Sequence, residues 1–256
     1  MATALITGGT SGIGAAFARA LAARGHDLVL VARNADRLSE MSTELKERYA
    51  ISVETIVTDL AVRDEVVGIA ERLTSVEQPI DMLINNAGFG IRSRLTDADT
   101  TPQEHAIDVM IRAVLILGAA AGRAMRQRGA GTIINVGSTA GFVAMGGYSA
   151  IKAWVTTYSE SLANELRGSG VTVTALCPGW VRTEFHERAG IRIGSIPDLL
   201  WLDADRLVAD CLKDVAAGKV ISIPSKRYKT LITICEHLPR RTVRAVSRQL
   251  TSRRKH

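Results

Sequence analysis

The sequence predicts an α/β fold in a single domain, with a doubly wound, seven-stranded parallel sheet and helices on both faces. Two observations support this fold class. Short apolar segments with strand-like composition alternate along the chain with longer helical patterns, and such alternation is typical of right-handed βαβ crossovers in a parallel sheet. A glycine-rich turn also follows the first apolar segment directly. The chain has 256 residues, 46% of them hydrophobic, which is enough for one buried core.

Strands and helices are expected in alternation along the whole chain. Strands are expected at residues 2–7, 26–33, 51–57, 82–84, 131–136, 171–177 and 219–223. Helices are expected after the glycine turn as far as residue 24, and at residues 35–49, 62–76, 101–128, 148–168 and 205–217. The helix at 101–128 is apolar nearly all round between Ala113 and Ala121. We therefore expect it to be buried between the sheet and a partner subunit.

Composition argues against several classes of protein. The longest apolar stretch, residues 113–122, is far shorter than the roughly 20 residues of a membrane-spanning helix. Met1 leads at once into a strand, so we expect no signal peptide. Three scattered cysteines form no disulfide framework and fit a reducing cytoplasm. The five histidines have no metal-ligand spacing, so no metal site is expected.

The basic character of the chain is confined to its C-terminal part. The net charge is +6, but seven Arg or Lys residues and no acid lie between His237 and the last residue. The rest of the chain is therefore close to neutral. This charge distribution does not indicate nucleic-acid binding by the body of the protein.

The turn after the first strand predicts a nucleotide site. Its sequence is Gly8-Gly9-Thr10-Ser11-Gly12-Ile13-Gly14. Glycines at this place let the backbone approach a pyrophosphate, and the helix that follows presents free N–H groups to the anion. A glycine-rich turn without a ligand is the alternative.

The ends of the second and third strands favour a particular nucleotide. A NAD site usually places a carboxylate at the end of the second strand, whereas NADP sites offer an arginine to the 2′-phosphate. Here Ala32-Arg33 supplies a guanidinium and no acid, which predicts a preference for NADP(H) over NAD(H), unless Arg33 is an ordinary surface residue. Asp59-Leu60 closes the third strand. Its carboxylate either meets an adenine amino group or caps the next helix.

A tyrosine and a lysine four residues apart suggest acid–base chemistry. Tyr148 and Lys152 follow the glycine turn Gly146-Gly147, at the start of a helical pattern, and residues four apart share one face of a helix. A free phenol has a pKa near 10, and a neighbouring cation lowers that pKa by favouring the phenolate. We therefore expect Lys152 to lower the pKa of Tyr148. An accidental pair on an amphipathic helix is the alternative.

Taken in order, these motifs resemble the short-chain dehydrogenase/reductase family, from residue 2 to about residue 224. The resemblance implies a Rossmann-like sheet and an NADP-preferring oxidoreductase. The motifs that carry it are the glycine turn at Gly8, Gly12 and Gly14, then Asp59, Asn85-Asn86-Ala87-Gly88, Ser138, Tyr148 with Lys152, and Pro178-Gly179.

The resemblance also implies residue roles. Tyr148 would exchange a proton with the carbonyl or alcohol oxygen, Ser138 would hydrogen-bond that oxygen, and Lys152 would lower the tyrosine pKa and bind the nicotinamide ribose. The cofactor-binding residues implied in this way are Gly8, Thr10, Ser11, Gly12, Ile13, Gly14, Arg33, Asp59, Leu60, Asn86, Ala87, Gly88, Tyr148, Lys152, Pro178, Gly179, Val181 and Thr183.

Two features depart from the family pattern. An asparagine usually lies in the long helix and shapes a water relay to the lysine, but Met110 occupies that place here. Methionine is not a strong hydrogen-bonding group, so the relay is replaced or impaired, unless Met110 merely packs and backbone groups hold the water. In addition, only nine residues separate Ser138 from Tyr148, about three fewer than usual in the family.

The resemblance divides the chain at residue 224. Residues 1–224 form the dinucleotide-binding domain, and residues 184–202 within it are expected to cap the substrate pocket. Residues 225–256 are expected to form a basic, amphipathic, helical extension, with an apolar stripe at Val243, Val246 and Leu250. Such a helix lies on an anionic membrane or packs on its own protein with its charged face in water.

The sequence thus favours an NADP(H)-dependent oxidoreductase that interconverts a ketone or aldehyde and an alcohol. The apolar cap suggests a hydrophobic substrate such as a ketoacyl chain or a steroid, although the same side chains would also suit packing on the protein itself. A homodimer or homotetramer in the cytoplasm is expected, with peripheral membrane association as an option. The alternatives are a nucleotide-binding scaffold or sensor with impaired turnover, suggested by Met110, and a membrane adaptor that acts through its tail.

Overall fold

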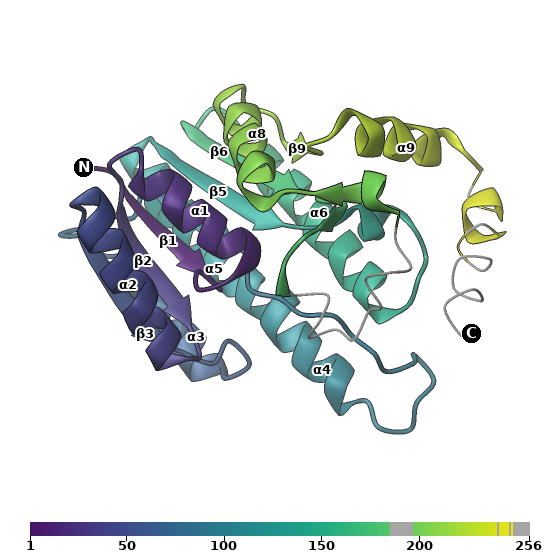
Figure 1. Ribbon diagram of the computed structural model, residues 1–256, viewed down its shortest axis with the longest axis horizontal. Helices are drawn as coiled ribbons and strands as arrows, with labels where there is room; N and C mark the ends of the chain where they lie inside the picture. Colours follow the sequence, from purple (N-terminus) through teal and green to yellow (C-terminus); the bar gives the residue numbers. More distant parts are fainter. Residues whose placement is uncertain (185–196, 240, 246, 248–256) are drawn as a thin grey trace.

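Seven parallel strands form the centre of the molecule in the computed structural model, which describes residues 1–184, 197–239, 241–245 and 247 (Figure 1). The strand order is β3-β2-β1-β4-β5-β6-β9. The strands are β1 Thr3–Thr7, β2 Asp27–Ala32, β3 Val53–Val57, β4 Met82–Asn85, β5 Gly131–Val136, β6 Val171–Leu176 and β9 Ile221–Ser222. Most residues of β1, β2, β5 and β6 are apolar and buried, as is typical of the inner strands of a parallel sheet. The predicted Rossmann-like, seven-stranded sheet is confirmed.

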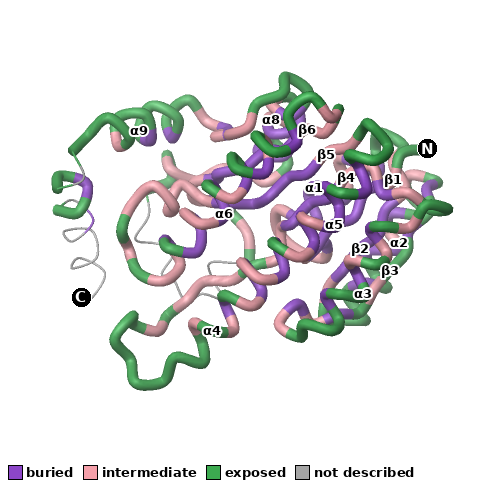
Figure 2. The backbone as a smooth tube through the Cα atoms, turned by 180° about the vertical axis from the view of Figure 1, so that it is seen from behind, coloured by how far each residue is buried: buried purple, intermediate pink, exposed green. Residues whose placement is uncertain are grey.

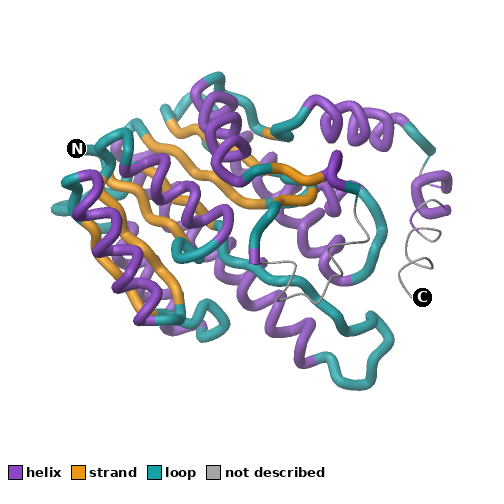
Figure 3. Tube along the Cα trace, viewed as in Figure 1, coloured by secondary structure: helices purple, strands orange, loops and turns teal. Residues whose placement is uncertain are grey.

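Helices cover both faces of this sheet (Figure 3). One hydrophobic cluster joins the sheet to α1 (Gly12–Ala22), α2 (Ala35–Tyr49) and α8 (Ala204–Ala216). A second cluster, on the opposite face, joins it to α3 (Arg63–Leu73), α5 (Ala113–Arg128) and α6 (Gly147–Glu165). The order of the strands reverses between β1 and β4, and ligands of such sheets bind at this switch point, beyond the C-terminal ends of the strands.

The long helix expected at residues 101–128 is interrupted. It consists of α4 (Thr101–Ile107), one π-helical turn (Asp108–Arg112) and α5 (Ala113–Arg128). The N–H of Ala113 bonds the carbonyl of Asp108, five residues back. Such π-turns widen a helix locally and are frequent at functional sites.

Thr101–Arg128 is also long and apolar enough to cross a membrane by length and composition. In the structure, however, 56% of its most apolar window is buried inside the protein. It packs on β4, β5 and α3, so its composition is that of a core helix. The burial expected on the sheet side is present, whereas Leu115 remains 46% exposed on the other side.

The C-terminal extension begins with α9 (Lys226–His237), which follows β9 along the chain and is largely exposed (Figure 2). Tyr228 and Ile232, one helical turn apart, are its buried residues, while Leu231 and Ile234 are exposed. Residues 241–245 are helical as well. Val243 is buried, so this part of the predicted apolar stripe packs on the protein itself. Val246 and Leu250 lie outside the described residues.

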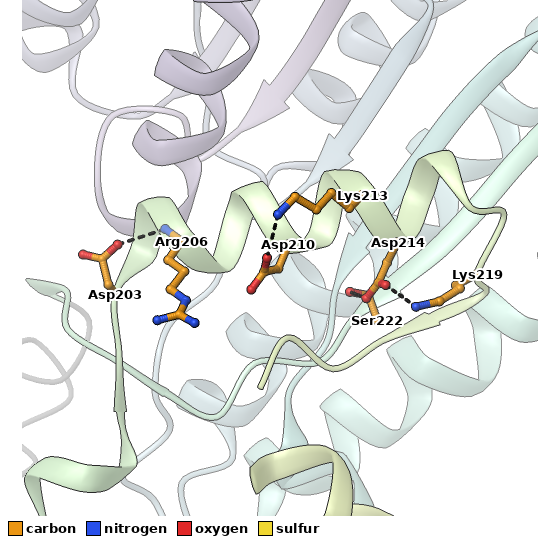
Figure 4. A network of polar contacts seen from close by, with 7 residues as sticks. All are labelled: Asp203, Arg206, Asp210, Lys213, Asp214, Lys219 and Ser222. Carbon is orange, nitrogen blue, oxygen red and sulfur yellow. Dashed lines mark hydrogen bonds and ion pairs between the residues drawn. The ribbon is translucent and has the colours of Figure 1, made fainter. Parts of the chain in front are cut away.

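Polar contacts attach the short edge strand β9 to α8 (Figure 4). Asp203 caps α8 by accepting a hydrogen bond from the Arg206 N–H at 2.9 Å. Near the other end of this helix, Asp214 accepts a hydrogen bond from the Ser222 hydroxyl at 2.7 Å and pairs with Lys219. Ser222 is fully buried, and a buried hydroxyl that loses its partner costs more than an exposed one.

We expect Asp214→Ala to lower the free energy of unfolding by about 1–3 kcal/mol, because it leaves the buried Ser222 hydroxyl without its acceptor. Urea unfolding at pH 7 measures this change. Asp210→Ala is the matched control, because Asp210 pairs with Lys213, whose side chain is 76% exposed. An exposed pair contributes about 0–1 kcal/mol, and equal losses in both variants would contradict the assigned role of Asp214.

Candidate active site

The predicted site residues converge on one edge of the sheet. The glycine turn follows β1, Asn86 follows β4, Ser138 follows β5 and Pro178 follows β6. Because all these strands are parallel, their C-terminal ends lie side by side (Figure 1). Segments far apart in the sequence therefore meet at one edge of the sheet, which includes the switch point.

The glycine turn has the conformation that a phosphate-binding loop needs. Gly8 and Gly12 adopt φ angles of +67° and +53°, in the left-handed region that glycine tolerates best. A Cβ atom on Gly14 would lie 2.2 Å from the carbonyl oxygen of Gly8, so no other residue fits there. α1 begins at Gly12 after Ser11, without a side-chain cap. The bare backbone and uncapped N–H groups fit the pyrophosphate of a dinucleotide.

Asn86 and Thr7 hold the glycine turn in place. The Asn86 side-chain amide donates to the carbonyl oxygens of Thr7 at 2.9 Å and Gly8 at 3.1 Å. The Thr7 hydroxyl accepts the backbone N–H groups of Asn86 and Ala87. These contacts join the ends of β1 and β4. Asn86 therefore supports the turn itself, which is the first element that a nucleotide would meet.

Arg33 lies at the end of β2, exposed, and it forms no ion pair or hydrogen bond with the residues described. Its guanidinium is thus accessible to an anion. Asp59 accepts a hydrogen bond from the Ala61 N–H at 2.9 Å, but the N-cap of α3 is Val62, so Asp59 does not cap that helix. Leu60 is buried beside it. A second guanidinium, that of Arg37, pairs with Glu184 at 2.9 Å.

Ser138, Tyr148 and Lys152 come together at the start of α6. The Lys152 ammonium nitrogen lies 5.7 Å from the centre of the Tyr148 ring, so both side chains share one face of the helix, as predicted. This nitrogen donates to the carbonyl of Val136 at 2.7 Å and is buried. The Ser138 hydroxyl accepts the Ala140 N–H at 3.1 Å and hydrogen-bonds the Tyr148 phenol. The shortened loop after Ser138 does not prevent the contact.

The protonation of this group differs from the sequence-based expectation. Burial raises the pKa of the Tyr148 phenol above its usual value, and the hydrogen bond from Ser138 offsets only part of that rise. Burial also lowers the pKa of Lys152 from 10.5 to about 8. The prediction that Lys152 lowers the tyrosine pKa is therefore wrong for the protein without a bound cofactor. Burial, which disfavours the charged phenolate, is the largest cause of the shift in the Tyr148 pKa.

Met110 lies next to this group, in the π-helical turn, and is 1% exposed. A Cβ atom on Gly88 would lie 3.0 Å from the Met110 sulfur and 3.7 Å from the Lys152 nitrogen. Gly88 therefore leaves room for both side chains. The interpretation that Met110 packs in the core agrees with its burial, and a thioether now lies where the family pattern has an amide.

The loop after β6 touches the glycine turn. A Cβ atom on Gly12 would lie 3.2 Å from Thr183, so the far end of the 178–183 loop contacts the start of α1. Val181 is buried in β7 (Trp180–Val181), which pairs with β8 (Trp201–Leu202). At the near end, the Pro178 carbonyl accepts the N–H and the hydroxyl of Thr139. The loop after β6 thus contacts the glycine turn at one end and the loop after β5 at the other.

Two sets of contacts were missed by sequence reasoning, although Asn85, which belongs to the first set, is part of the Asn85-Asn86-Ala87-Gly88 motif. The first is a buried ladder in which the Asn85 amide donates to Asn135, and the Asn135 amide donates to Ser159, both at 2.9 Å. A polar Asn135 inside an otherwise apolar strand was a usable signal. The second is Tyr228 of α9, whose hydroxyl contacts Trp180 and Leu200. No local sequence pattern pointed to it.

Part of the predicted pocket cap cannot be located. Residues 185–196 lie outside the described part of the chain. Of the flanking segments, Arg182 is exposed, pairs with Asp198 at 2.6 Å and lies over the Trp201 ring. Within the residues that the structure describes, no group of three or more His, Cys, Asp or Glu side chains is arranged to hold a metal ion.

The family model for short chain dehydrogenases matches residues 2–192. The chain belongs to this family. The match covers both the glycine turn and the Ser138, Tyr148 and Lys152 group, so the expected family membership is confirmed and the protein is an oxidoreductase of the short-chain dehydrogenase family.

Relatives of known sequence and structure agree with this assignment. An uncharacterized oxidoreductase from Staphylococcus saprophyticus is 36% identical over 183 residues, covering 70% of this chain and 78% of the relative. A short-chain dehydrogenase from Sphingobium yanoikuyae, solved in complex with NADPH, is 34% identical, with a TM-score of 0.84 and coverage of 92% and 94% of the two chains. An alcohol dehydrogenase from Comamonas testosteroni, specific for bulky-bulky ketones, is 30% identical, with a TM-score of 0.80 and coverage of 93% and 95%.

The lowered pKa of Lys152 predicts how stability depends on pH. Below about pH 8 the lysine is charged in both folded and unfolded protein and burial of the charge is unfavourable, whereas above 10.5 it is neutral in both. The protein without cofactor should therefore gain stability relative to Lys152→Met as pH rises from about 8 to 10.5. The gain should be at most about 3–4 kcal/mol, at roughly 1.4 kcal/mol per pKa unit.

Urea unfolding of both proteins across this pH range measures the difference. The variant lacks the hydrogen bond to Val136, which changes its free energy of unfolding by the same amount at every pH. The titration of the buried ammonium, in contrast, makes the difference between the two proteins depend on pH. A constant separation from pH 7 to pH 11 would contradict the assigned protonation.

Proposed function

We propose that this oxidoreductase uses NADP(H) to interconvert a ketone or aldehyde and an alcohol on a hydrophobic substrate. The observation that carries the proposal is the convergence of Ser138, Tyr148 and Lys152 beside a glycine turn that only bare backbone fits. A bound nicotinamide nucleotide supplies or accepts the hydride in such a reaction. The similar Sphingobium yanoikuyae structure contains NADPH, which supports the choice of cofactor.

The side chains of this protein have separate tasks in the proposal. The phenol of Tyr148 donates a proton to the substrate oxygen during reduction and accepts it during oxidation. Ser138 hydrogen-bonds the same oxygen and stabilises the charge that develops on it. Lys152 is held at the carbonyl of Val136 and places a cation next to the ribose position. The other residues implied for the cofactor follow the C-terminal ends of β1, β2, β3, β4 and β6.

In the protein without substrate, the site has the protonation that carbonyl reduction requires. Because burial raises the pKa of Tyr148, its phenol is protonated at neutral pH and can act as an acid without prior change. The Ser138 hydroxyl accepts from the Ala140 N–H, and a substrate oxygen would take the place of the Tyr148 phenol as the partner of its proton. Both groups are therefore hydrogen-bond donors to a carbonyl oxygen.

The class of substrate follows from the surroundings of the site. Trp180 and Trp201 flank the loop after β6, with ring centroids 6.2 Å apart. Apolar surroundings of this kind fit a hydrophobic carbonyl compound. The similar alcohol dehydrogenase from Comamonas testosteroni acts on bulky-bulky ketones, and we infer a ketone with large substituents on both sides as the substrate class.

A nucleotide-binding scaffold or sensor is the second candidate. Met110 favours it, because its thioether lies beside Gly88 near the Lys152 ammonium and cannot replace the amide of the family pattern as a hydrogen-bonding group. Such a protein would bind NADPH and turn over no carbonyl compound.

Assembly and location belong to the same proposal. Leu115 of α5 and Ile107 of α4 are exposed on the outer side of the long helix, which supports a homodimer or homotetramer through that face. In the extension, Leu231, Ile234 and Leu238 are exposed next to basic residues of α9. This face would suit peripheral contact of a cytoplasmic enzyme with an anionic membrane, and binding to anionic vesicles is the direct measurement.

Tyr148→Phe should lower kcat/KM for carbonyl reduction by about 10²–10⁴, because it removes the proton donor and keeps the ring. Steady-state NADPH oxidation with a panel of bulky ketones measures this. Tyr158→Phe is the matched control on the same helix, where the hydroxyl contacts only the Leu115 carbonyl, at 3.5 Å, among the hydrogen bonds described. If the unmodified protein binds NADPH but reduces no compound of a broad panel, this proposal is refuted and the nucleotide-binding scaffold is favoured.

Arg33→Ala should raise KM for NADPH about tenfold or more, because a charge-assisted hydrogen bond to the 2′-phosphate contributes about 1.5–3 kcal/mol. KM for NADH should not change, since NADH has no such phosphate, and it serves as the internal control. Equal use of NADH and NADPH by the unmodified protein would refute the cofactor preference.

A further inference from the structure

The chain returns to the site after its last sheet strand. β9 ends at Ser222, and Ser225 then turns the backbone sharply, with a φ angle of 152°. This turn brings α9 alongside the loop that follows β6. A non-glycine residue in such a conformation costs of order 1–3 kcal/mol and persists only where other contacts fix it. The contacts that fix it are made by the first turn of α9.

Tyr228 of this first turn lies directly on the loop after β6. A Cβ atom on Gly179 would lie 2.1 Å from the Cζ atom of the Tyr228 ring, so residue 179 has no room for any side chain. The Tyr228 hydroxyl accepts the Trp180 N–H at 3.2 Å and donates to the Leu200 carbonyl at 2.8 Å. Tyr228 is 6% exposed. One buried hydroxyl therefore joins Trp180 of β7 to Leu200, the residue that directly precedes β8.

The same loop is joined to the residue that hydrogen-bonds Tyr148. The Pro178 carbonyl accepts the N–H of Thr139 at 2.9 Å and its hydroxyl at 3.2 Å, and Thr139 directly follows Ser138. A continuous set of contacts thus runs from Tyr228 through Gly179 and Pro178 to Ser138. Displacement of Tyr228 would move the loop after β6 and the loop after β5 together.

A second contact comes from further along the extension. The Ser247 hydroxyl accepts the Ala144 N–H at 3.2 Å and donates to the Val243 carbonyl at 2.8 Å. Ser247 is 1% exposed. Ala144 lies in the short loop between Ser138 and Tyr148. The described part of the extension therefore packs on the loop after β6 and on the loop between Ser138 and Tyr148.

We propose that Tyr228 is a positioning residue for the active site, which fixes the Pro178-Gly179-Trp180 loop against the nicotinamide position and the Ser138 loop. The proposal rests on the function proposed above, because that function places the nicotinamide beside Pro178 and Gly179. It assigns a role in the reaction to the C-terminal extension. Tyr228 acts through backbone groups and does not touch the reacting atoms.

Loss of the Tyr228 hydroxyl should affect turnover more than binding. The glycine turn and Arg33 hold the adenosine side of the dinucleotide, at strands β1 and β2, and neither contacts Tyr228. The loop after β6 aligns the nicotinamide side, and small misplacement of reacting groups has large effects on rate. Tyr228→Phe keeps the ring on Gly179 and removes only the two hydrogen bonds.

The experiment compares Tyr228→Phe with the unmodified protein by two measurements. With NADPH and the best ketone of the panel, kcat should fall about tenfold while KM for NADPH changes less than about twofold. In the protein without cofactor, hydrogen exchange should show the Trp180 amide protected, and its exchange rate should rise about tenfold in Tyr228→Phe. Tyr49→Phe is the matched control, since Tyr49 ends α2, far from this loop, and it should leave both measurements unchanged.

The two measurements keep the proposal separate from the function on which it rests. A protein that binds no NADPH, or reduces no ketone, refutes the proposed function, and the exchange rate of the Trp180 amide then still tests the contact of Tyr228. An unprotected Trp180 amide in the unmodified protein would overturn the proposal. So would an unchanged kcat in Tyr228→Phe, a change confined to KM, or an equal loss in Tyr49→Phe.

Discussion

A positive charge buried at the end of a core strand is the constraint on which the site depends. The Lys152 ammonium is 4% exposed and donates to the carbonyl of Val136 at 2.7 Å. A buried charge is unfavourable unless it is paired and hydrogen-bonded, so this contact ties the first turns of α6 to the end of β5. Ser138 lies two residues after Val136, and Tyr148 lies one helical turn before Lys152. The contact between Val136 and Lys152 therefore brings Ser138 and Tyr148 together.

The fold and the backbone elements of the site could be predicted from the sequence. Parallel strands are buried on both faces and therefore read as apolar runs, and the helices between them fix the right-handed crossovers. Gly12 and Gly14 were informative because each position favours glycine. Gly12 has a positive φ angle, and the Gly8 carbonyl lies too close to Gly14 for a side chain. Tyr148 and Lys152 share a helix face because their spacing is a local property.

Other features depend on the folded environment and left no local signal. The π-helical turn at Asp108–Arg112 contains no glycine or proline to mark it. The sign of the Tyr148 pKa shift was predicted wrongly, because the sequence shows a neighbouring cation but not how much water the site excludes. Tyr228 was missed because its contacts with Gly179, Trp180 and Leu200 join parts of the chain that no periodicity connects.

The buried amide ladder has a consequence for the alignment of the whole site. Asn85 and Asn135 face each other as register partners on β4 and β5, and their side chains are hydrogen-bonded to one another and then to Ser159 of α6. A shift of one residue in the register of these two strands would leave two buried amides without their hydrogen-bond partners. The ladder thus fixes the register of β4 and β5. It thereby fixes the position of Asn86, which supports the glycine turn, relative to Ser138, which lies three residues beyond Asn135.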